Sequence, residues 1–193
     1  MFRYRLGFTL IELLVVLAVI GLSITLAVPS WALVSQKRSL TNAAEQVAAF
    51  LATAQTEAQK RNQAISLAFN RTADQSWCVG TSIGTTSCDC TETDPASAQY
   101  CTIDGTASRL GSETLQSLNL IGADDTQPSS GDSFITFDPV RGILQPVGDK
   151  LLLTFESTGG HYQLRVSISP TGLMKICNPT DTRPVGGYAT CAI

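Results

Sequence analysis

The chain has 193 residues, enough for one domain and one additional element, with 13 lysines and arginines, 16 aspartates and glutamates and a formal net charge of −3. Charged residues make up 15%, below the roughly 25% of an average soluble domain, and the apolar surplus lies at one end. This composition excludes a disordered chain and a polytopic membrane protein, and the mild acidity argues against a broad nucleic-acid-binding face.

The first predicted element is a long apolar helix near the N-terminus. Two arginines, Arg3 and Arg5, precede an apolar run over residues 8–28, which is long enough as a helix to cross a bilayer about 30 Å thick. The positive-inside bias holds the arginines in the cytoplasm and places everything after Pro29 outside. A signal anchor and a cleaved secretory signal are simple interpretations, but the run exceeds a secretory core of about 7–15 residues. Neither interpretation explains Glu12, a carboxylate inside the run.

A carboxylate in a spanning segment costs about 2.5–3.5 kcal/mol on insertion scales, so a functional reason is expected. The segment Gly7-Phe8-Thr9-Leu10-Ile11-Glu12-Leu13, followed by the apolar run and Pro29, resembles the class III signal of type IV pilins and pseudopilins. The resemblance implies that a prepilin peptidase cleaves between Gly7 and Phe8 and methylates the new amine of Phe8. It also implies that Glu12 pairs with the positive N-terminus of a neighbouring subunit in the filament. Pairing with the amine of its own chain is the alternative.

We expect the helix to continue to about residue 62, weakened or kinked at Gly21 and Pro29. After Pro29, apolar side chains recur at steps of three, four or seven, which is typical of a stripe packed on the protein's own core. The predicted segments are a leader (1–7), a transmembrane and assembly helix (8–29), an amphipathic helix (30–62) and a β-rich head (63–193). The stripe comprises Leu33, Leu40, Ala44, Val47, Leu51, Ala54 and Ala58.

After Asn62 the apolar period changes to two, which is typical of strands, and turn sequences rich in Gly, Pro and Asp separate the candidates. One long helix followed by strands at this spacing indicates an α+β fold with an antiparallel sheet. The polar segment 81–132 is predicted to be mostly loop. The predicted strands cover residues 65–69, 77–79, 134–137, 151–155, 162–168 and 174–177.

Two further segments narrow the resemblance to the GspH/FimT group, which contains minor pilins of type IV pili and the minor pseudopilin of type II secretion. They are Phe137-Asp138-Pro139-Val140-Arg141-Gly142 and residues 168–177, and the cysteine-containing segments are similar to those of FimU/FimT minor pilins. The resemblance implies a pilin-like fold, with the first half of the helix embedded in the inner membrane and a periplasmic head. It also implies a role near the pilus tip in priming assembly, twitching and adhesion. The implied partners are other minor pilins, the major pilin, the inner membrane and prepilin peptidase; a type II secretion pseudopilin is the alternative.

All six cysteines lie in the predicted exported head, where an even number indicates disulfides. Cys177 and Cys191 form the natural C-terminal pair, which closes a loop worth roughly 3 kcal/mol. Cys88 and Cys90 are too close to pair with each other. A metal site is less favoured because zinc sites prefer Cys-x₂₋₄-Cys spacing and reducing compartments, so neither a metal nor a cofactor is expected. The partners left for Cys88 and Cys90 are Cys78 and Cys101, in an order that the sequence leaves open.

The sequence does not indicate an enzyme. The single histidine, His161, follows a predicted turn, and no nucleophile elbow, phosphate loop or His-rich motif is present. Charge is uneven, with ten acidic residues and one base between positions 72 and 138 and an excess of bases afterwards. Some FimT relatives take part in DNA uptake and bind DNA through a Gly-Arg-x-Arg motif, so a DNA-uptake pilin that binds DNA through its C-terminal region is a further alternative. The matching positions 172–175 are Gly-Leu-Met-Lys, however, without either arginine. The candidate DNA contacts are therefore Lys175 and Arg183, and a structural role is favoured.

Overall fold

The computed structural model describes residues 9–71, 76–113, 115, 118–122, 135–145, 147, 150–180 and 182–191. The side chains of residues 25–30 and 118–122 are outside that description. The chain divides into two compact units, Met1–Ser35 and Gln36–Ile193, which are described separately. One helix, α1 (Leu10–Arg61), belongs partly to each.

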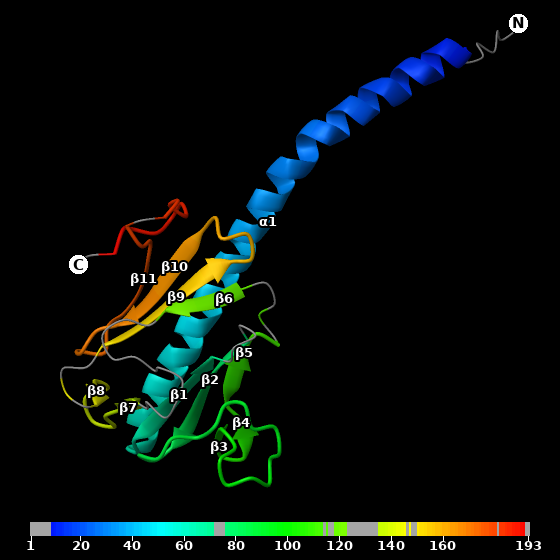
Figure 1. The fold of residues 1–193 in the computed structure, drawn as a ribbon. Helices are drawn as coiled ribbons and strands as arrows, with labels where there is room; N and C mark the ends of the chain where they lie inside the picture. The colour runs from blue at the N-terminus through cyan, green and yellow to red at the C-terminus, as the bar shows by residue number, and fades with distance from the viewer. Residues whose placement is uncertain are drawn as a thin grey trace, which may run out of the picture. The chain divides into compact units, whose positions relative to one another are not determined.

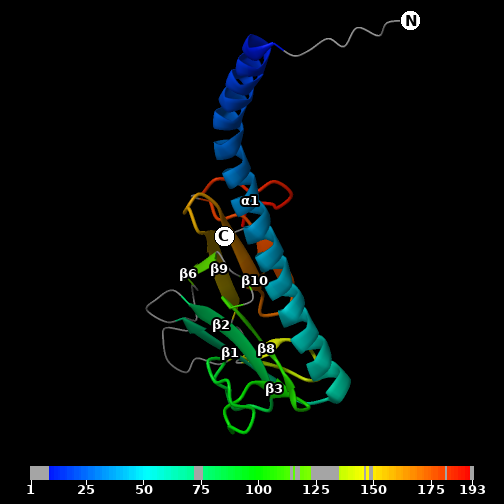
Figure 2. The same cartoon turned by 90° about the vertical axis from the view of Figure 1, so that its right-hand side faces the viewer.

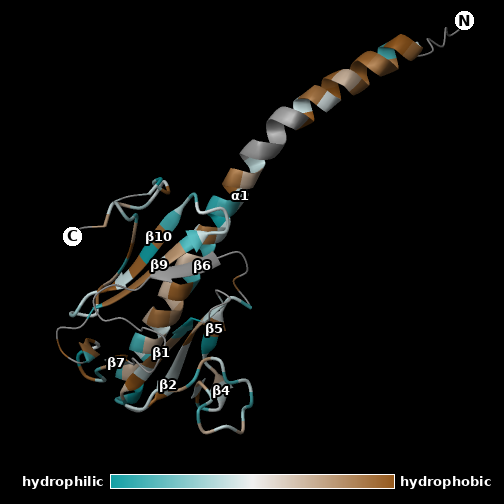
Figure 3. Ribbon diagram, in the orientation of Figure 1, coloured by the Kyte–Doolittle hydropathy of each residue, from teal (hydrophilic) through white to brown (hydrophobic). Residues whose placement is uncertain are grey.

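The first unit contains the N-terminal part of α1. Thr9 caps the helix: its hydroxyl oxygen accepts a hydrogen bond from the Glu12 backbone N–H (3.3 Å), and its carbonyl accepts one from Leu13 (3.2 Å). Every residue from 9 to 24 is exposed, and Figure 3 shows how apolar this end of the helix is. The helical assignment continues through Gly21 and Pro29. Among the described helical residues, none form a segment with both the length and the hydropathy needed to cross a bilayer.

The second unit, the head, contains the rest of α1 and short antiparallel strands in three sheets, and Figure 2 shows α1 along one side of the strands. The expected α+β, pilin-like fold, with a long helix packed on antiparallel sheet, is confirmed. The first sheet has the order β5-β2-β1-β7-β8, formed by β1 (Ile65–Arg71), β2 (Trp77–Ile83), β5 (Arg109–Gly111), β7 (Ile135–Phe137) and β8 (Leu144–Gln145). The second has the order β11-β10-β9-β6, formed by β6 (Leu118–Gly122), β9 (Leu151–Ser157), β10 (Gln163–Ile168) and β11 (Met174–Cys177). The third pairs β3 (Thr102–Ile103) with β4 (Thr106–Ala107).

One hydrophobic core joins α1 to both large sheets. Phe137 from the first sheet and Phe155 from the second are completely buried in it, and the ring centroids of Trp77 and Phe155 lie 5.1 Å apart. Each fully buried aliphatic side chain contributes about 1.5–3 kcal/mol relative to an exposed one. Because the second part of α1 supplies a continuous stripe of apolar side chains to this core, it is an integral part of the head. The buried stripe residues are Leu40, Ala44, Val47, Leu51, Ala54 and Ala58, while Leu33 is half-buried.

The helix ends at Arg61, within one residue of the expected position. Asn62 adopts a positive φ of 51°, its N–H donates to the Gln59 carbonyl (3.3 Å), and the Gln63 N–H donates to the Ala58 carbonyl (3.2 Å). This pair of bonds is the Schellman motif, which asparagine tolerates in place of glycine.

The described part of the segment 81–132 is mostly loop, as expected, but it also includes strands that the sequence did not predict. It contains the end of β2 and the strands β3, β4, β5 and β6. These strands are short, so an alternating apolar pattern has no room to develop, and an Asp104-Gly105 turn with positive φ at both residues joins β3 to β4. The two-residue strand β8 was also not predicted, and Phe134 lies outside the described residues.

Candidate assembly segment and head surface

Glu12 lies in the first turn of α1, at the end of the described chain that is closest to the predicted cleavage site. Gly7 and Phe8 lie outside the described residues. Among the described residues, none of the ion pairs involves Glu12. The positive end of the helix dipole favours a carboxylate at this position, so Glu12 also suits its own helix. The sequence signal from which this cap could have been predicted is the Thr-x-x-Glu spacing of residues 9–12.

Disulfides fix the segment that follows β2. The structure pairs Cys78 with Cys90 and Cys88 with Cys101, with Cα–Cα distances of 5.8 and 5.1 Å, and so resolves the order that the sequence left open. Gly80 lies directly against them: a Cβ there would overlap the Cys101 sulfur and come within 2.8 Å of the Cys90 Cβ. Only glycine fits this position, which explains its place two residues after Cys78.

The C-terminal tail is also tied down. Cys177 and Cys191 form a disulfide with a Cα–Cα distance of 4.9 Å. The buried Asn178 side chain donates to the carbonyls of Val185 (3.1 Å) and Tyr188 (2.7 Å) and accepts the Val185 N–H (2.8 Å).

The tail is fastened to α1 through Tyr188. Its hydroxyl donates to Glu45 (2.6 Å). Burial, and then the Glu45 carboxylate, raise the pKa of Tyr188 to about 12. The disulfide and these hydrogen bonds therefore give the tail a defined conformation on the surface of the head.

Two turns, 138–142 and 169–173, meet at one end of the head, and we call them the locked turns (Figure 1). The first follows β7 in one sheet, and the second joins β10 to β11 in the other. The Gln55 side chain of α1 donates to the carbonyls of both Gly142 (2.6 Å) and Gly172 (3.0 Å). Both glycines have positive φ, +65° and +79°, and a Cβ on Gly172 would overlap the Gly142 carbonyl oxygen. Gln55 therefore joins the helix and the two sheets at a single point.

The structure does not bring the two candidate DNA contacts together. Lys175 is exposed on β11 opposite Ser167, and Arg183 is exposed beside Tyr162. Since Ser167 and Tyr162 are five residues apart along β10, these positions are separated by about 16 Å. Leu173, at a position where the DNA-binding motif has arginine, is 56% exposed.

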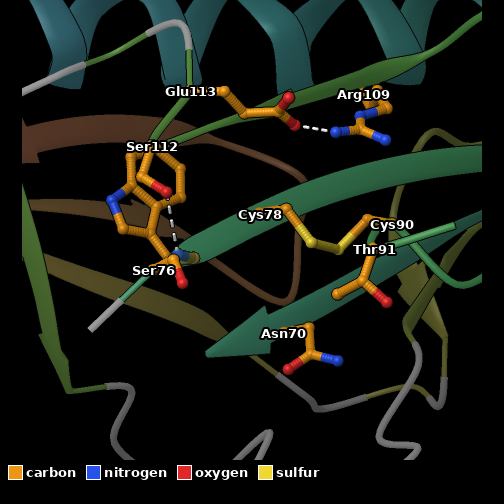
Figure 4. Close-up of a pocket in the computed structure, with 9 residues that line it drawn as sticks. Asn70, Ser76, Cys78, Cys90, Thr91, Arg109, Ser112 and Glu113 are labelled. Carbon is orange, nitrogen blue, oxygen red and sulfur yellow. Dashed lines mark hydrogen bonds and ion pairs between the residues drawn. A yellow bond between two sulfur atoms is a disulfide. The ribbon is translucent and has the colours of Figure 1, made fainter. Parts of the chain in front are cut away.

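A cavity of about 300 Å³ opens beside β2 and β5 (Figure 4). Arg109 and Glu113 face each other there as an ion pair, and Arg109 also donates to the Glu92 carbonyl (3.0 Å). The Ser112 hydroxyl accepts the Trp77 N–H (3.3 Å). The cavity wall includes the Cys78–Cys90 disulfide, whose sulfurs are not nucleophiles in this oxidised form.

The residues considered for metal binding do not form a site in the described part of the chain. His161 is exposed in the bend between β9 and β10. No group of three or more His, Cys, Asp and Glu side chains within the described ranges is placed to hold a metal ion.

Comparisons with known proteins identify two matching regions. Residues 43–172 match the family described as type II transport protein GspH, and residues 2–28 match the prokaryotic N-terminal methylation motif. A protein of uncharacterized function from Haemophilus influenzae is 35% identical over 86 residues, 44% of this chain and 51% of that protein. The aligned part of the chain thus spans about half the length of that curated relative.

Solved structures of similar fold include a minor pilin and a minor pseudopilin. The type IV minor pilin FimU of Pseudomonas aeruginosa matches over 78% of this chain and 96% of its own, with 20% identity and a TM-score of 0.48. The minor pseudopilin EpsH from the type 2 secretion system of Vibrio cholerae matches over 74% of this chain and 99% of its own, with 14% identity and a TM-score of 0.46.

Proposed function

Since this chain belongs to the GspH family of pilin-like proteins, we propose that it is a minor pilin of a type IV pilus, placed near the tip, where it helps to prime assembly. The observation that carries the proposal is the order of the two matching regions. A methylation motif covers the start of α1, and a GspH head begins on the same helix. The chain is a structural component and a substrate of prepilin peptidase, which cleaves between Gly7 and Phe8 and methylates Phe8.

Processing converts a membrane segment into an assembly segment. Before cleavage, Arg3 and Arg5 hold the leader (1–7) in the cytoplasm, the helix 8–29 lies in the inner membrane, and the head is periplasmic. Residues 10–24 expose apolar side chains on every face of α1, and such a helix needs lipid or other helices around it. In the filament, neighbouring helices replace the lipid, and the helix at 30–62 remains packed in its own head.

Glu12 provides the register of that packing. A carboxylate in an apolar environment needs a cation, and cleavage creates one in the amine of Phe8. Pairing between Glu12 of one subunit and the amine of the next would align the two helices. Twitching and adhesion follow from the presence of the filament.

The corresponding minor pseudopilin of type II secretion is the second candidate, and the description of the matching family as a type II transport protein favours it. The similarity of the cysteine-containing segments and the C-terminal ending to FimU/FimT minor pilins supports the pilus instead. DNA uptake is less well supported because the positions where the DNA-binding motif has arginine are Leu173 and Lys175, and lysine lacks the bidentate fork of arginine.

Deletion and complementation test the proposal. The deletion strain is scored for surface piliation, twitching, secretion and transformation together; the pilus proposal predicts loss of the first two with secretion intact. Loss of secretion alone would establish the pseudopilin, and loss of transformation with normal piliation would establish DNA uptake.

The pairing role of Glu12 is tested in the same strain. Glu12→Ala should be cleaved normally but be absent from sheared filaments. Ser23→Ala, which changes another exposed polar residue of this segment, should assemble. Normal incorporation of Glu12→Ala would refute the pairing role.

A further inference from the structure

The described part of the head has few large apolar side chains on its surface. Those that are mostly exposed are Val140 (76%), Val147 (71%) and Leu173 (56%). Single exposed apolar residues are common on soluble proteins. Here, however, Val140 and Leu173 lie on the two locked turns, which meet at Gly142 and Gly172. Two elements from different sheets thus present apolar side chains at the same end of the head.

Hydrogen bonds hold each turn in one conformation. In the first, an Asp138 carboxylate oxygen accepts the N–H groups of Val140 (2.9 Å) and Arg141 (2.7 Å). In the second, the Ser169 hydroxyl accepts the Leu173 N–H (3.1 Å) and bonds the Thr171 hydroxyl (2.8 Å). Together with Gln55, these bonds order the backbone that carries the exposed side chains before any partner arrives. A surface with an ordered backbone loses less conformational entropy on binding than a flexible loop does.

Positive charge flanks the apolar pair. Arg141 is exposed next to Val140 in the first turn. The Ser169 N–H donates to the Leu173 carbonyl (3.0 Å), which continues the β10–β11 ladder, so Leu173 and Lys175 lie on the same side of the hairpin. The one carboxylate of the locked turns, Asp138, bonds its own turn. Exposed apolar side chains with a cation near each are complementary to apolar side chains that have carboxylates beside them.

We infer that the locked turns are a docking surface for the head of a neighbouring pilin-type subunit, which presents apolar side chains edged by carboxylates. The inference rests on the proposed function and names the part of the head that makes the contact. Filaments are built from heterologous contacts, in which each subunit uses two different patches. In this chain the segment 72–138 has ten acidic residues and one base, and the partner that we infer is a head with a similar excess of acidic residues. Such a head offers the charge that Arg141 and Lys175 require.

DNA is less compatible with this surface. Phosphate backbones are bound by arrays of Arg and Lys side chains, and apolar side chains add little to such contacts. The locked turns expose Val140 and Leu173, and a single cation lies close to each along the chain, Arg141 and Lys175. A protein partner can contact the apolar side chains and pair with the cations as well.

Photocrosslinking in the producing cell tests the inference on the full-length chain. A photoreactive amino acid replaces Leu173, or replaces His161 in the exposed β9–β10 bend as a control. The adducts are identified by mass spectrometry, and intact disulfides on non-reducing gels report folding. We expect an adduct with a pilin-type subunit at position 173 at least five times stronger than at 161. Arg141→Glu with Lys175→Glu should remove it.

A second set of variants separates this surface from exposed apolar residues in general. Val140→Ser with Leu173→Ser should reduce incorporation into filaments at least five-fold, whereas Val147→Ser, an equally exposed valine outside the locked turns, should not. Equal losses in both variants would overturn the inference, as would equal adducts at 173 and 161 or an adduct with DNA alone. If filaments contain the chain but position 173 forms no pilin adduct, the docking surface is wrong and the proposed function stands. If the chain enters no filament and forms no pilin adduct, both are wrong.

Discussion

Replacing Gln55 with leucine should loosen the locked turns without changing the exposed surface of the head. The amide nitrogen of Gln55 donates to the carbonyls of Gly142 (2.6 Å) and Gly172 (3.0 Å), and both glycines are buried. Leucine has a similar volume and retains the apolar contacts of the helix. It leaves two carbonyl groups without this donor, at about 1 kcal/mol for each bond. The expected loss is therefore about 2 kcal/mol, or about 4–8 °C in Tm for a chain of this length.

Thermal unfolding of the full-length chain in detergent, followed by near-ultraviolet circular dichroism with the disulfides intact, measures this loss. The matched control is Gln46→Leu, the same substitution at an exposed position of the same helix, which should change Tm by less than 2 °C. Gln55→Glu should lower Tm more than Gln55→Leu does, because it brings a carboxylate oxygen against two carbonyl oxygens. If the Gln55→Leu and Gln46→Leu variants have the same Tm, Gln55 does not hold the turns.

Three further predictions use matched pairs. Gly172→Ala and Gly187→Ala both place alanine at positive φ, a strain of roughly 1–2 kcal/mol, but only the first meets the Gly142 carbonyl, so its Tm should be clearly lower. The double replacements Cys88→Ser/Cys101→Ser and Cys177→Ser/Cys191→Ser open loops of similar length and should each lose about 3 kcal/mol in denaturant unfolding, with a larger loss for the more buried first pair. Because the folded pKa of Tyr188 is raised from 10 to about 12, the stability advantage of the wild type over Tyr188→Phe should be complete below pH 10 and fall between pH 10 and 12; a constant difference would contradict this.

The fold class can be predicted from the sequence because the apolar residues of α1 recur with a clear helical period. Its buried positions from Leu40 to Ala58 recur at helical steps, and the sheet pattern begins directly after Asn62. The strands β1, β9 and β10 alternate over six or seven residues, enough for the pattern to be visible. The strands of two or three residues between 102 and 111 carry no such pattern, since the disulfides and a tight turn hold them. Their existence could not be predicted from periodicity.

The candidate site also has parts that the sequence predicts and parts that it does not. Chemistry that lies within one segment, such as Gly7, Phe8 and Glu12, is visible in the sequence. Contacts between distant residues are not visible, since Gln55 lies 87 positions from Gly142 and 117 from Gly172. Gln55 is not one of the apolar residues of the predicted stripe, so a polar side chain at this position would be assigned to solvent. The glycines signal turns but do not reveal that the turns touch.

The two turn segments that carry the GspH/FimT resemblance therefore contain two kinds of position. Asp138, Gly142, Ser169 and Gly172 are required by the turns themselves, through backbone bonds and positive φ. The side chains of Val140, Arg141 and Leu173, by contrast, are exposed. Any head that contains the same locked turns must keep the residues that form them, whereas the exposed side chains can vary without loss of the fold. If the locked turns bind a neighbouring subunit, partner choice depends on the exposed side chains, and exchanging these side chains between related heads should change the partner without changing Tm.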